Sequence, residues 1–262
     1  MPLSHLRLLA LDLDDTLLRS DHLISPRTLD GLRRWRAAGG HVVVATGRPT
    51  RSIAAALPPD LHDVPWITYN GAEVILCGER IYTNLIAVED TRAVVRLAEA
   101  ALPDCILGLE IDDTLFLNRP MERTTPYQVA RLLDVATRPA AKILAFHTDA
   151  ATVDGVLHRL PTCTRAIVSA KYHLVQILAA SADKAEALRF LVQRLGLDMQ
   201  NVAAFGDDVN DVDMVRDAGY GVAVANAVPE VIAVADCVTQ SNDEDGVAAV
   251  VEQLLPSLLR SG

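Results

Sequence analysis

The chain has 262 residues, half of which are hydrophobic, and its 24 basic and 34 acidic residues give a formal net charge of −10. This length suits one large domain or two small ones, and the acidic balance argues against a nucleic-acid-binding surface. It does not exclude a phosphorylated ligand, because a bound cation can invert the local field. No long apolar stretch precedes the first acids and no run of about 18 apolar residues occurs, so we expect a cytoplasmic protein without a membrane span.

The first 50 residues have the pattern of a βαβ unit. The apolar run Arg7–Leu13 ends in acids, as a buried parallel strand does. Ser25-Pro26 is typical of a helix N-cap followed by proline at the first helical position, and Gly39-Gly40 is a helix end signal. The run HVVVATG at 41–47 predicts a second buried strand, so a right-handed crossover should join two parallel strands.

The same hydrophobic patterns and turn signals predict the remaining helices and strands along the chain. We expect a short helix at Arg51–Leu57, a strand at Trp66–Tyr69, a hairpin around Cys77-Gly78 and an amphipathic helix at Val88–Ala101. The next part should contain a strand or hairpin at Cys105–Leu117, helices at Tyr127–Leu133 and Thr152–Leu160, and strands at Lys142–His147, Ala166–Ser169 and Leu174–Leu178. The last part should contain a helix at Lys184–Leu195, a strand at Asn201–Phe205, a helix at Asp211–Ala218, a strand at Tyr220–Val224 and closing elements at Val228–Ala235, Cys237-Val238 and Val247–Leu255.

The chain has four cysteines and no CxxC pair, so we expect the cysteines to be small buried side chains.

The chain changes character near Asn84 and again near Asp183. Between these points the pattern is α+β, without the rhythm of strand, acid and helix that marks both ends of the chain. We therefore predict the α/β class, with a doubly wound, Rossmann-like parallel-sheet core formed by residues 1–83 and 181–262. Residues 84–180 should form an inserted α+β cap domain.

Polar residues gather where the predicted core strands end, which is where open α/β sheets bind ligands. They are Asp12, Asp14, Asp15 and Thr16 after the first strand; Thr46, Gly47 and Arg48 after the second; Asn70 and Gly71 after the third; and Gly206, Asp207, Asp208, Asn210 and Asp211 after a later one. Carboxylates that converge from two strand ends offer the hard oxygen ligands that suit Mg²⁺, and the cation would offset their repulsion. A lysine at a helix start, Lys184, and a threonine beside such a site suit a phosphoryl group. Asp12 and Asp14, two residues apart at a strand end, can supply a nucleophile and a proton donor.

These motifs resemble those of the haloacid dehalogenase (HAD) superfamily of phosphohydrolases. LDLDDT at 11–16 resembles the DxDxT signature, and Thr46-Gly47-Arg48 is similar to the TGR motif of the Cof-like branch. Asn70-Gly71 resembles that branch's NG element, Lys184 its third-motif lysine, and GDDVND at 206–211 its GDxxND motif. The motifs occur in order over most of the chain, and Asn226-Ala227 resembles a further downstream element.

The resemblance implies a role for each matching residue. Asp12 would attack phosphorus and Asp14 would act as acid and base. The metal would involve Asp12, the Asp14 backbone carbonyl and Asp207, with Asp211 supporting it. Phosphoryl oxygens would be held by Thr46, Gly47, Lys184 and Asn210, while Arg48, Asn70 and Gly71 would support the site or the substrate. Two positions depart from the pattern: Ala185 stands where the branch usually has glycine, and Asp15 where relatives more often have glycine or asparagine.

A second copy of the acidic motif, LEIDDTLF, lies at 109–116. Glu110 occupies the position of Asp12, but its side chain is one methylene longer and would misplace an in-line attack. No TG, lysine and GDxxND follow this copy in order. We therefore expect Asp112, Asp113 and Thr114 to form a solvated hairpin edge; the alternative is that they face the site and help to select the substrate.

The function expected from the resemblance is a Mg²⁺-dependent phosphatase for a small phosphorylated metabolite, with a sugar phosphate favoured. It would form an aspartyl-phosphate and act without a nucleic acid or membrane partner, as a monomer or weak homo-oligomer. One alternative is a phosphoryl mutase or transferase of the same superfamily. The other is a phosphoaspartate signalling domain or a non-catalytic binding protein.

Overall fold

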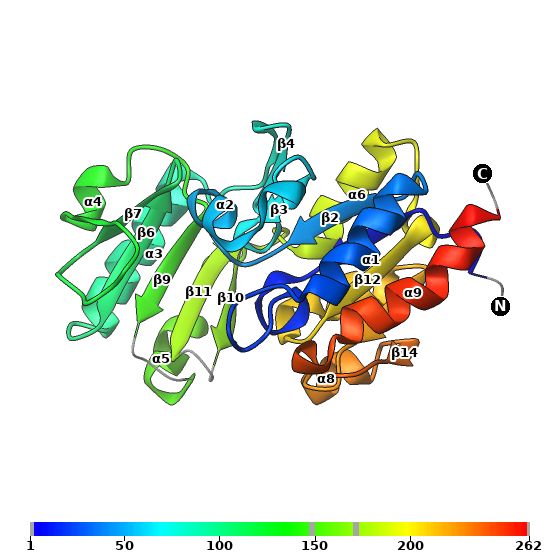
Figure 1. Ribbon diagram of the computed structural model, residues 1–262. Helices are drawn as coiled ribbons and strands as arrows, with labels where there is room; N and C mark the ends of the chain where they lie inside the picture. Colours follow the sequence, from blue (N-terminus) through cyan, green and yellow to red (C-terminus); the bar gives the residue numbers. More distant parts are fainter. Residues whose placement is uncertain (1–2, 147–149, 170–172, 261–262) are drawn as a thin grey trace. The chain divides into compact units, whose positions relative to one another are not determined.

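The computed structural model describes residues 3–146, 150–169 and 173–260, and the chain divides into two compact units. One unit consists of Met1–Tyr82 and Asp183–Gly262, and the other of Thr83–Ala182. The second unit is therefore inserted into the first along the chain (Figure 1). The expected fold class, an α/β parallel-sheet core with an α+β insertion, is confirmed.

An eight-stranded sheet in the order β14-β13-β12-β1-β2-β3-β4-β5 is central to the first unit. The strands are β1 (Leu8–Leu11), β2 (His41–Ala45), β3 (Trp66–Thr68), β4 (Glu73–Leu76), β5 (Glu79–Thr83), β12 (Val202–Gly206), β13 (Tyr220–Ala223) and β14 (Cys237–Val238). The pairs from β14 to β3 are parallel, and β4 is antiparallel to β3. The helices are α1 (Pro26–Ala37), α2 (Ile53–Ala56), α6 (Lys184–Arg194), α7 (Val212–Asp217), α8 (Pro229–Ile232) and α9 (Gly246–Leu259).

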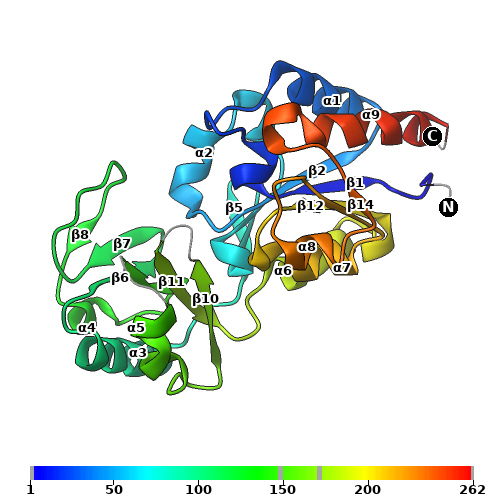
Figure 2. The same cartoon turned by 90° about the horizontal axis from the view of Figure 1, so that it is seen from below.

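Helices cover both faces of this sheet, as Figure 2 shows for α1 and α9 on one face and α6 and α7 on the other. Alternate residues of a strand point to opposite faces. Leu9 and Leu11 of β1 therefore pack with α1 and α9, whereas Leu8 and Ala10 pack with α6 and α7. Because both faces are buried, β1 is apolar throughout and its polar residues come only after it ends.

The first helix begins and ends at the predicted signals. Ser25 Oγ accepts a hydrogen bond from the Thr28 amide, with Pro26 at the first helical position. Gly39 follows the helix with φ of 87°, the left-handed conformation that ends many helices. Trp35 on this helix is fully buried and donates from its indole nitrogen to the His41 carbonyl, so it is a core residue.

The inserted unit contains a six-stranded sheet in the order β10-β11-β9-β6-β7-β8. Its strands are β6 (Ile106–Ile111), β7 (Thr114–Leu117), β8 (Gln128–Val129), β9 (Lys142–Phe146), β10 (Thr164–Ser169) and β11 (Leu174–Ala179). Its helices are α3 (Val88–Ala101), α4 (Leu132–Val135) and α5 (Ala150–Leu157). Apolar residues of α3 and α5 line a small cavity together with residues of β6, β9 and β11, so these helices cover one face of the sheet.

Some expected elements of the inserted unit are wrong. The helix expected at Tyr127–Leu133 is replaced by β8 and α4, because β8 pairs with β7 as the edge strand of the sheet and leaves Val129 about half exposed. The helix expected at Thr152–Leu160 is present as α5, but it ends earlier, at Leu157. The expected strand end at His147 lies outside the described residues. The expectation of buried cysteines is also wrong, because Cys77 and Cys163 are exposed and Cys105 and Cys237 are only partly buried.

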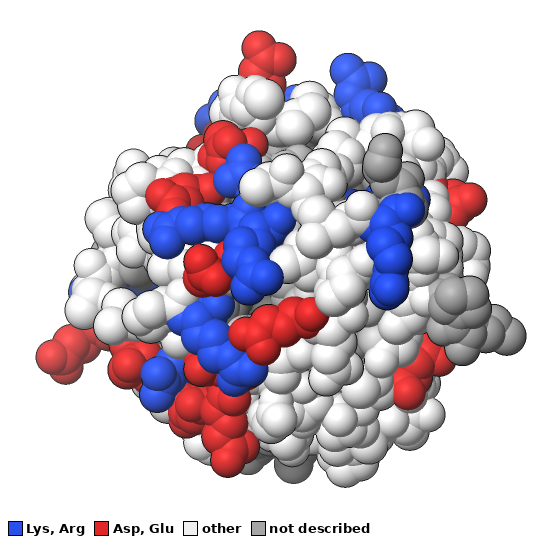
Figure 3. Space-filling model, turned by 45° about the vertical axis from the view of Figure 1, so that its right-hand side comes forward, with Lys and Arg blue, Asp and Glu red and all other residues white. Residues whose placement is uncertain are grey.

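Charged side chains of both signs are interleaved on the surface. Exposed ion pairs join Arg27 of α1 to Glu252 of α9, and Arg33 of α1 to Asp60. Figure 3 shows blue and red side chains side by side on one face. That face lacks the uniformly basic surface that would follow a nucleic-acid backbone. Within the described ranges, no helix has both the length and the apolar character needed to cross a membrane.

Candidate active site

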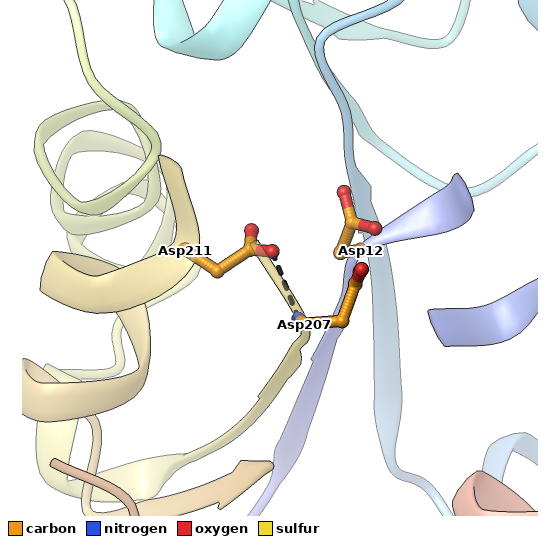
Figure 4. Close-up of side chains that lie close together, drawn as sticks. All are labelled: Asp12, Asp207 and Asp211. Atoms are coloured by element: carbon orange, nitrogen blue, oxygen red, sulfur yellow. Dashed lines mark hydrogen bonds between the residues drawn. The ribbon is translucent and has the colours of Figure 1, made fainter. Parts of the chain in front are cut away.

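Two neighbouring strand ends bring the first carboxylates together. Asp12 follows β1 and Asp207 follows β12, and the Asp12 amide donates to the Phe205 carbonyl at 3.0 Å. Asp211 comes from the turn that leads into α7. Figure 4 shows the three side chains pointing toward one another. Because β1 and β12 are parallel neighbours, Asp12 and Asp207 lie close together although they are almost 200 positions apart in the chain.

The three carboxylates form a buried cluster with one lysine. Each of Asp12, Asp207 and Asp211 offers an oxygen, and these oxygens all lie within 4.8 Å of one another. Lys184 Nζ, at the start of α6, donates to Asp12 Oδ1 at 2.5 Å and to Asp211 Oδ1 at 2.6 Å. The lysine is only 1% exposed, so its charge belongs to the cluster and not to the surface.

Asp211 is held by its own loop. Its Oδ2 accepts hydrogen bonds from the amides of Asp207 and Asp208, at 3.1 and 3.2 Å. A Cβ atom on Gly206 would lie 2.4 Å from Asp211 Cβ, so only glycine allows this close return of the loop. Both Asp211 oxygens are therefore already engaged, by Lys184 and by these amides, whereas Asp207 accepts a hydrogen bond from Thr16 Oγ1 at 2.8 Å.

Burial and mutual repulsion disfavour the ionised carboxylates. Burial, followed by the charge of Asp211, raises the pKa of Asp12 well above its usual range, and Lys184 opposes this only in part. Burial and Asp211 also raise the pKa of Asp207 to about 7. Burial alone would lower the pKa of Lys184, but the charges of Asp12 and Asp211 outweigh it and raise that pKa. The lysine therefore stays charged while the acids repel one another.

The donor set fits a hard divalent cation. With all groups ionised, three carboxylates and one ammonium group leave two net negative charges in a buried site. Carboxylate oxygens are the ligands that Mg²⁺ prefers, and a divalent cation would balance this excess. The side chains present are thus suited to such an ion, and Asp12 and Asp207 have oxygens available to it.

The raised pKa of Asp207 predicts how stability depends on pH in the metal-free protein. Because the folded state binds this proton more tightly than the unfolded state, the contribution is stabilising at low pH and is lost as pH rises from about 4 to about 7. Asp207→Asn should therefore flatten the fall in unfolding free energy over this window, as measured by urea denaturation at several pH values. At pH 8, added Mg²⁺ should stabilise the natural protein but have much less effect on the variant. Parallel pH curves for the two proteins would contradict the assignment.

The loop after β2 packs against the third strand end. Thr46 is fully buried, and its Oγ1 accepts a hydrogen bond from the Arg48 amide at 3.1 Å. A Cβ atom on Gly47 would lie 2.8 Å from Asn70 Oδ1, which explains a glycine at this position. Asn70 Oδ1 in turn accepts from Asn210 Nδ2 at 2.9 Å. The predicted residues of three motifs are therefore in direct contact.

The turn at Tyr69–Gly71 connects this loop to the helix that carries Lys184. All three of its residues have positive φ, with values of 52°, 55° and 94°. The Tyr69 amide donates to the Arg48 carbonyl, and the Asn70 amide donates to the Thr46 carbonyl. A Cβ atom on Gly71 would lie 2.0 Å from the carbonyl oxygen of Asp183, the N-cap of α6. The turn thus sets the position at which α6 begins.

Gly71→Ala should displace the start of α6 and with it Lys184 Nζ. We expect turnover to fall by about 10–100-fold, because small displacements of a catalytic group have effects of this size. Gly78→Ala is the matched control, since Gly78 also has positive φ, 79°, but nothing lies within 4 Å of its added Cβ. Both variants should lose roughly 1–2 kcal/mol from left-handed backbone strain. Equal activities of the two variants would show that the Gly71 contact does not position the site.

Asp14 does not join the carboxylate cluster. Its carboxylate forms a bidentate ion pair with Arg48, through Nε at 2.9 Å and Nη2 at 2.5 Å. Asp14 lies in the wide turn Leu13–Leu17, in which Asp15 has φ of 60°. Aspartate, like asparagine, adopts this left-handed conformation more readily than most other non-glycine residues, so Asp15 is compatible with the turn.

Comparison with known proteins decides the family. A model of the haloacid dehalogenase-like hydrolases matches residues 9–251. The chain belongs to this family. The 5-amino-6-(5-phospho-D-ribitylamino)uracil phosphatase YitU of Bacillus subtilis is 29% identical over 262 residues, covering 94% of this chain and 96% of that protein. The phosphatase YwpJ of Bacillus subtilis is 29% identical over 287 residues, covering 95% and 100%.

Solved structures agree with this assignment. A phosphatase of the haloalkanoate (HAD) enzyme superfamily from Bacteroides thetaiotaomicron has a TM-score of 0.83 and 27% identity, and the match covers 97% of each chain. The family resemblance drawn from the motifs is therefore confirmed, as is the expectation of an enzyme of this hydrolase family. The match extends over both units of the chain.

The second acidic motif of this hydrolase lies in the inserted unit and has a different structure. Asp112 and Asp113 form the two-residue turn between β6 and β7, with φ of 46° and 58°, as hairpin turns of this length require. Asp112 also pairs with Arg138. Glu110 lies within β6, opposite Lys142 of β9, and not after a strand end as Asp12 does. The expected hairpin is confirmed.

Several supporting residues of the hydrolase site received no role from the motifs. Asn226 Nδ2 donates to the Asp15 carbonyl at 2.8 Å, and Asn242 Nδ2 donates to the Leu18 carbonyl at 2.9 Å. Asn226 Oδ1 also accepts from the Asn242 amide. These bonds tie the turn that carries Asp14 to the C-terminal part of the chain. Asn226 was visible as part of a motif, but nothing in the sequence around Asn242 indicates this contact.

Proposed function

We propose that this hydrolase is a Mg²⁺-dependent phosphatase that hydrolyses a small phosphorylated metabolite through an aspartyl-phosphate on Asp12. The observation that carries the proposal is the buried cluster in which Asp12 lies 2.5 Å from Lys184 Nζ, with Asp207 and Asp211 close by. A nucleophile beside a buried cation and a pair of further carboxylates suits an electrophilic, anionic phosphorus centre. The names of the relatives as phosphatases support the same reaction.

The reaction would proceed in two displacements at phosphorus. A carboxylate oxygen of Asp12 attacks phosphorus in line, the bond to the ester oxygen breaks, and Asp14 gives its proton to that leaving oxygen. Asp14 then takes a proton from water, whose oxygen attacks phosphorus while the bond to Asp12 breaks. Inorganic phosphate leaves, and Asp12 is again a free carboxylate. Asp14 thus returns to its protonated state in each cycle.

The remaining residues would hold the phosphoryl group and the cation. Asp12, Asp207 and the Asp14 backbone carbonyl would hold Mg²⁺, with Asp211 supporting them, and the ion when bound supplies positive charge that offsets the charge on the phosphoryl oxygens. The proposed ligands of those oxygens are Thr46, Gly47, Lys184 and Asn210. Arg48, Asn70 and Gly71 would act as supporting residues. The hydrogen bond between Asn210 and Asn70 supports this grouping.

The substrate is proposed to be a small phosphate ester, with sugar-type phosphates favoured. The name of the relative YitU, whose substrate carries a phosphorylated ribityl chain, is consistent with a polyhydroxylated ester. We propose that the unit with the eight-stranded sheet is the hydrolase core and that the inserted unit is the cap domain that selects the substrate. The proposed cellular location is the cytoplasm.

Phosphate release from a panel of sugar, nucleotide and cofactor phosphates, with Mg²⁺ and after its removal by chelation, tests the proposal. We expect release that depends on Mg²⁺, and the ranking of the esters should identify the substrate class. An added acceptor alcohol distinguishes hydrolysis from transfer. Formation of a new ester in place of inorganic phosphate would identify a transferase, and no release from any ester would overturn the proposal.

A further inference from the structure

The bidentate ion pair between Arg48 and Asp14 links two motifs that lie 34 residues apart. Both pairs of atoms are within hydrogen-bond distance, at 2.9 and 2.5 Å, and both side chains are partly buried. A guanidinium group that meets a carboxylate in this way fixes the plane of the carboxylate as well as its position. Arg27 of α1 forms a bidentate pair with Glu252 as well, but both side chains of that pair are more exposed than those of Arg48 and Asp14.

Both partners are anchored through their backbones. The Arg48 amide donates to Thr46 Oγ1, and its carbonyl accepts from the Tyr69 amide. On the other side, the Leu17 amide donates to the Asp12 carbonyl, and Asn226 Nδ2 donates to the Asp15 carbonyl. Because these contacts hold the two backbones, the ion pair gives Asp14 a defined direction and does not simply neutralise a mobile acid.

We propose that Arg48 is a positioning residue that acts through Asp14, holding its carboxylate in the orientation that takes a proton from water during hydrolysis of the aspartyl-phosphate. This inference rests on the proposed phosphatase function. Each Asp14 oxygen that accepts one bond from Arg48 keeps a second lone pair for the proton of water.

The step that depends on this orientation is the second displacement. Water loses one proton to an Asp14 oxygen, and its own oxygen forms a bond to phosphorus. The bond between phosphorus and the Asp12 oxygen breaks, and its electron pair returns to the Asp12 carboxylate. The first displacement with a good leaving group needs no proton from Asp14, so it should depend much less on Arg48.

The competing interpretation is that Arg48 binds the phosphoryl group of the substrate directly. In that case the loss of Arg48 would weaken substrate binding and slow the first displacement. The two interpretations differ in kcat/KM, which reports only the steps up to the release of the leaving group. They also differ in whether the phosphorylated enzyme accumulates.

The experiment uses Arg48→Ala with 4-nitrophenyl phosphate and Mg²⁺ as the probe. We expect kcat to fall by about 10–100-fold, in line with the contribution of a well-placed base, while kcat/KM stays within about 3-fold because KM falls with kcat. Acid quenching followed by intact-protein mass measurement should show a phosphorylated form of Arg48→Ala that is nearly absent from the natural enzyme. A fall in kcat/KM that equals or exceeds the fall in kcat, without a phosphorylated form, would overturn the inference.

Matched variants separate positioning from general damage. Arg48→Lys keeps the charge but cannot form the bidentate pair, so it should recover only part of the loss. Arg33→Ala removes an arginine of α1 that pairs with Asp60, and it should leave both kinetic constants unchanged. Thermal unfolding of Arg48→Ala with Mg²⁺ shows whether the variant is folded; if it is not, Arg48→Lys carries the test through the same phosphorylated form.

A double-mutant cycle completes the test. If Arg48 acts only through Asp14, adding Arg48→Ala to Asp14→Asn should slow hydrolysis of the phosphorylated enzyme by less than about 2-fold further. A further loss as large as that of Arg48→Ala alone would show an independent role and reject the inference. The natural enzyme distinguishes a failure of the proposed function from a failure of this inference. If it releases no phosphate from any ester, the proposed phosphatase function is wrong. If it turns over and the Arg48 variants have the same kinetic constants, only the role of Arg48 is rejected.

Discussion

Asp12→Asn should lower phosphate release by about 10⁴-fold or more, the scale seen when a nucleophile is removed from an enzyme. The amide cannot attack phosphorus as a carboxylate does, and no other described carboxylate follows β1 at this point and also contacts Lys184. Initial rates of phosphate release at saturating substrate and Mg²⁺ provide the measurement. Turnover near that of the natural enzyme would exclude an aspartyl-phosphate on Asp12.

Two controls accompany this variant. Because burial raises the pKa of Asp12, replacing it with a neutral amide removes a buried negative charge, so the metal-free variant should remain folded at pH 8. Asp12→Glu keeps the charge but extends the side chain by one methylene, as in the second motif at Glu110. It should retain stabilisation by Mg²⁺ and still lose most activity, since the attacking oxygen is misplaced. Loss of folding in both variants would leave the inactivity without mechanistic meaning, so urea denaturation is measured first.

Lys184→Met should destabilise the metal-free protein by about 3–5 kcal/mol at pH 8, the range found when one partner of a buried ion pair is removed. Methionine has a similar length and no charge, so Asp12 and Asp211 lose the cation that lies between them. The loss should be smaller at pH 5, because the raised pKa values of Asp12 and Asp207 allow them to bind protons there and relieve the repulsion. Urea denaturation at both pH values provides the measurement.

The double variant Lys184→Met, Asp211→Asn tests the cause. Removing the facing carboxylate should restore part of the stability at pH 8, whereas a purely steric defect at the start of α6 would remain. Added Mg²⁺ should also recover part of the stability of Lys184→Met. An equal loss at pH 5 and pH 8, with no effect of Asp211→Asn, would show that the lysine contributes packing and not charge compensation.

Structural features that depend only on residues close together in the chain could be predicted from the sequence. The N-cap at Ser25, the helix end near Gly39 and the apolar run before Asp12 all follow from signals a few residues long, and the structure has each of them. The motif order also indicated the family, which the family match confirms. The same local approach failed at Tyr127–Leu133, where part of the segment pairs with β7 as the edge strand β8 in place of an expected helix.

The fold class, the family and the residues at the strand ends could thus be predicted from the sequence, because a buried parallel strand has polar residues only after its last residue. Which of these residues contact one another depends on how the strands and helices pack. The order β12-β1-β2-β3 brings Asp12 beside Asp207, while the packing of α6 places Lys184 between Asp12 and Asp211. Contacts such as Arg48 with Asp14, or Gly71 with Asp183, join residues far apart in the chain. No local propensity encodes such contacts, because they exist only after strands and helices have packed.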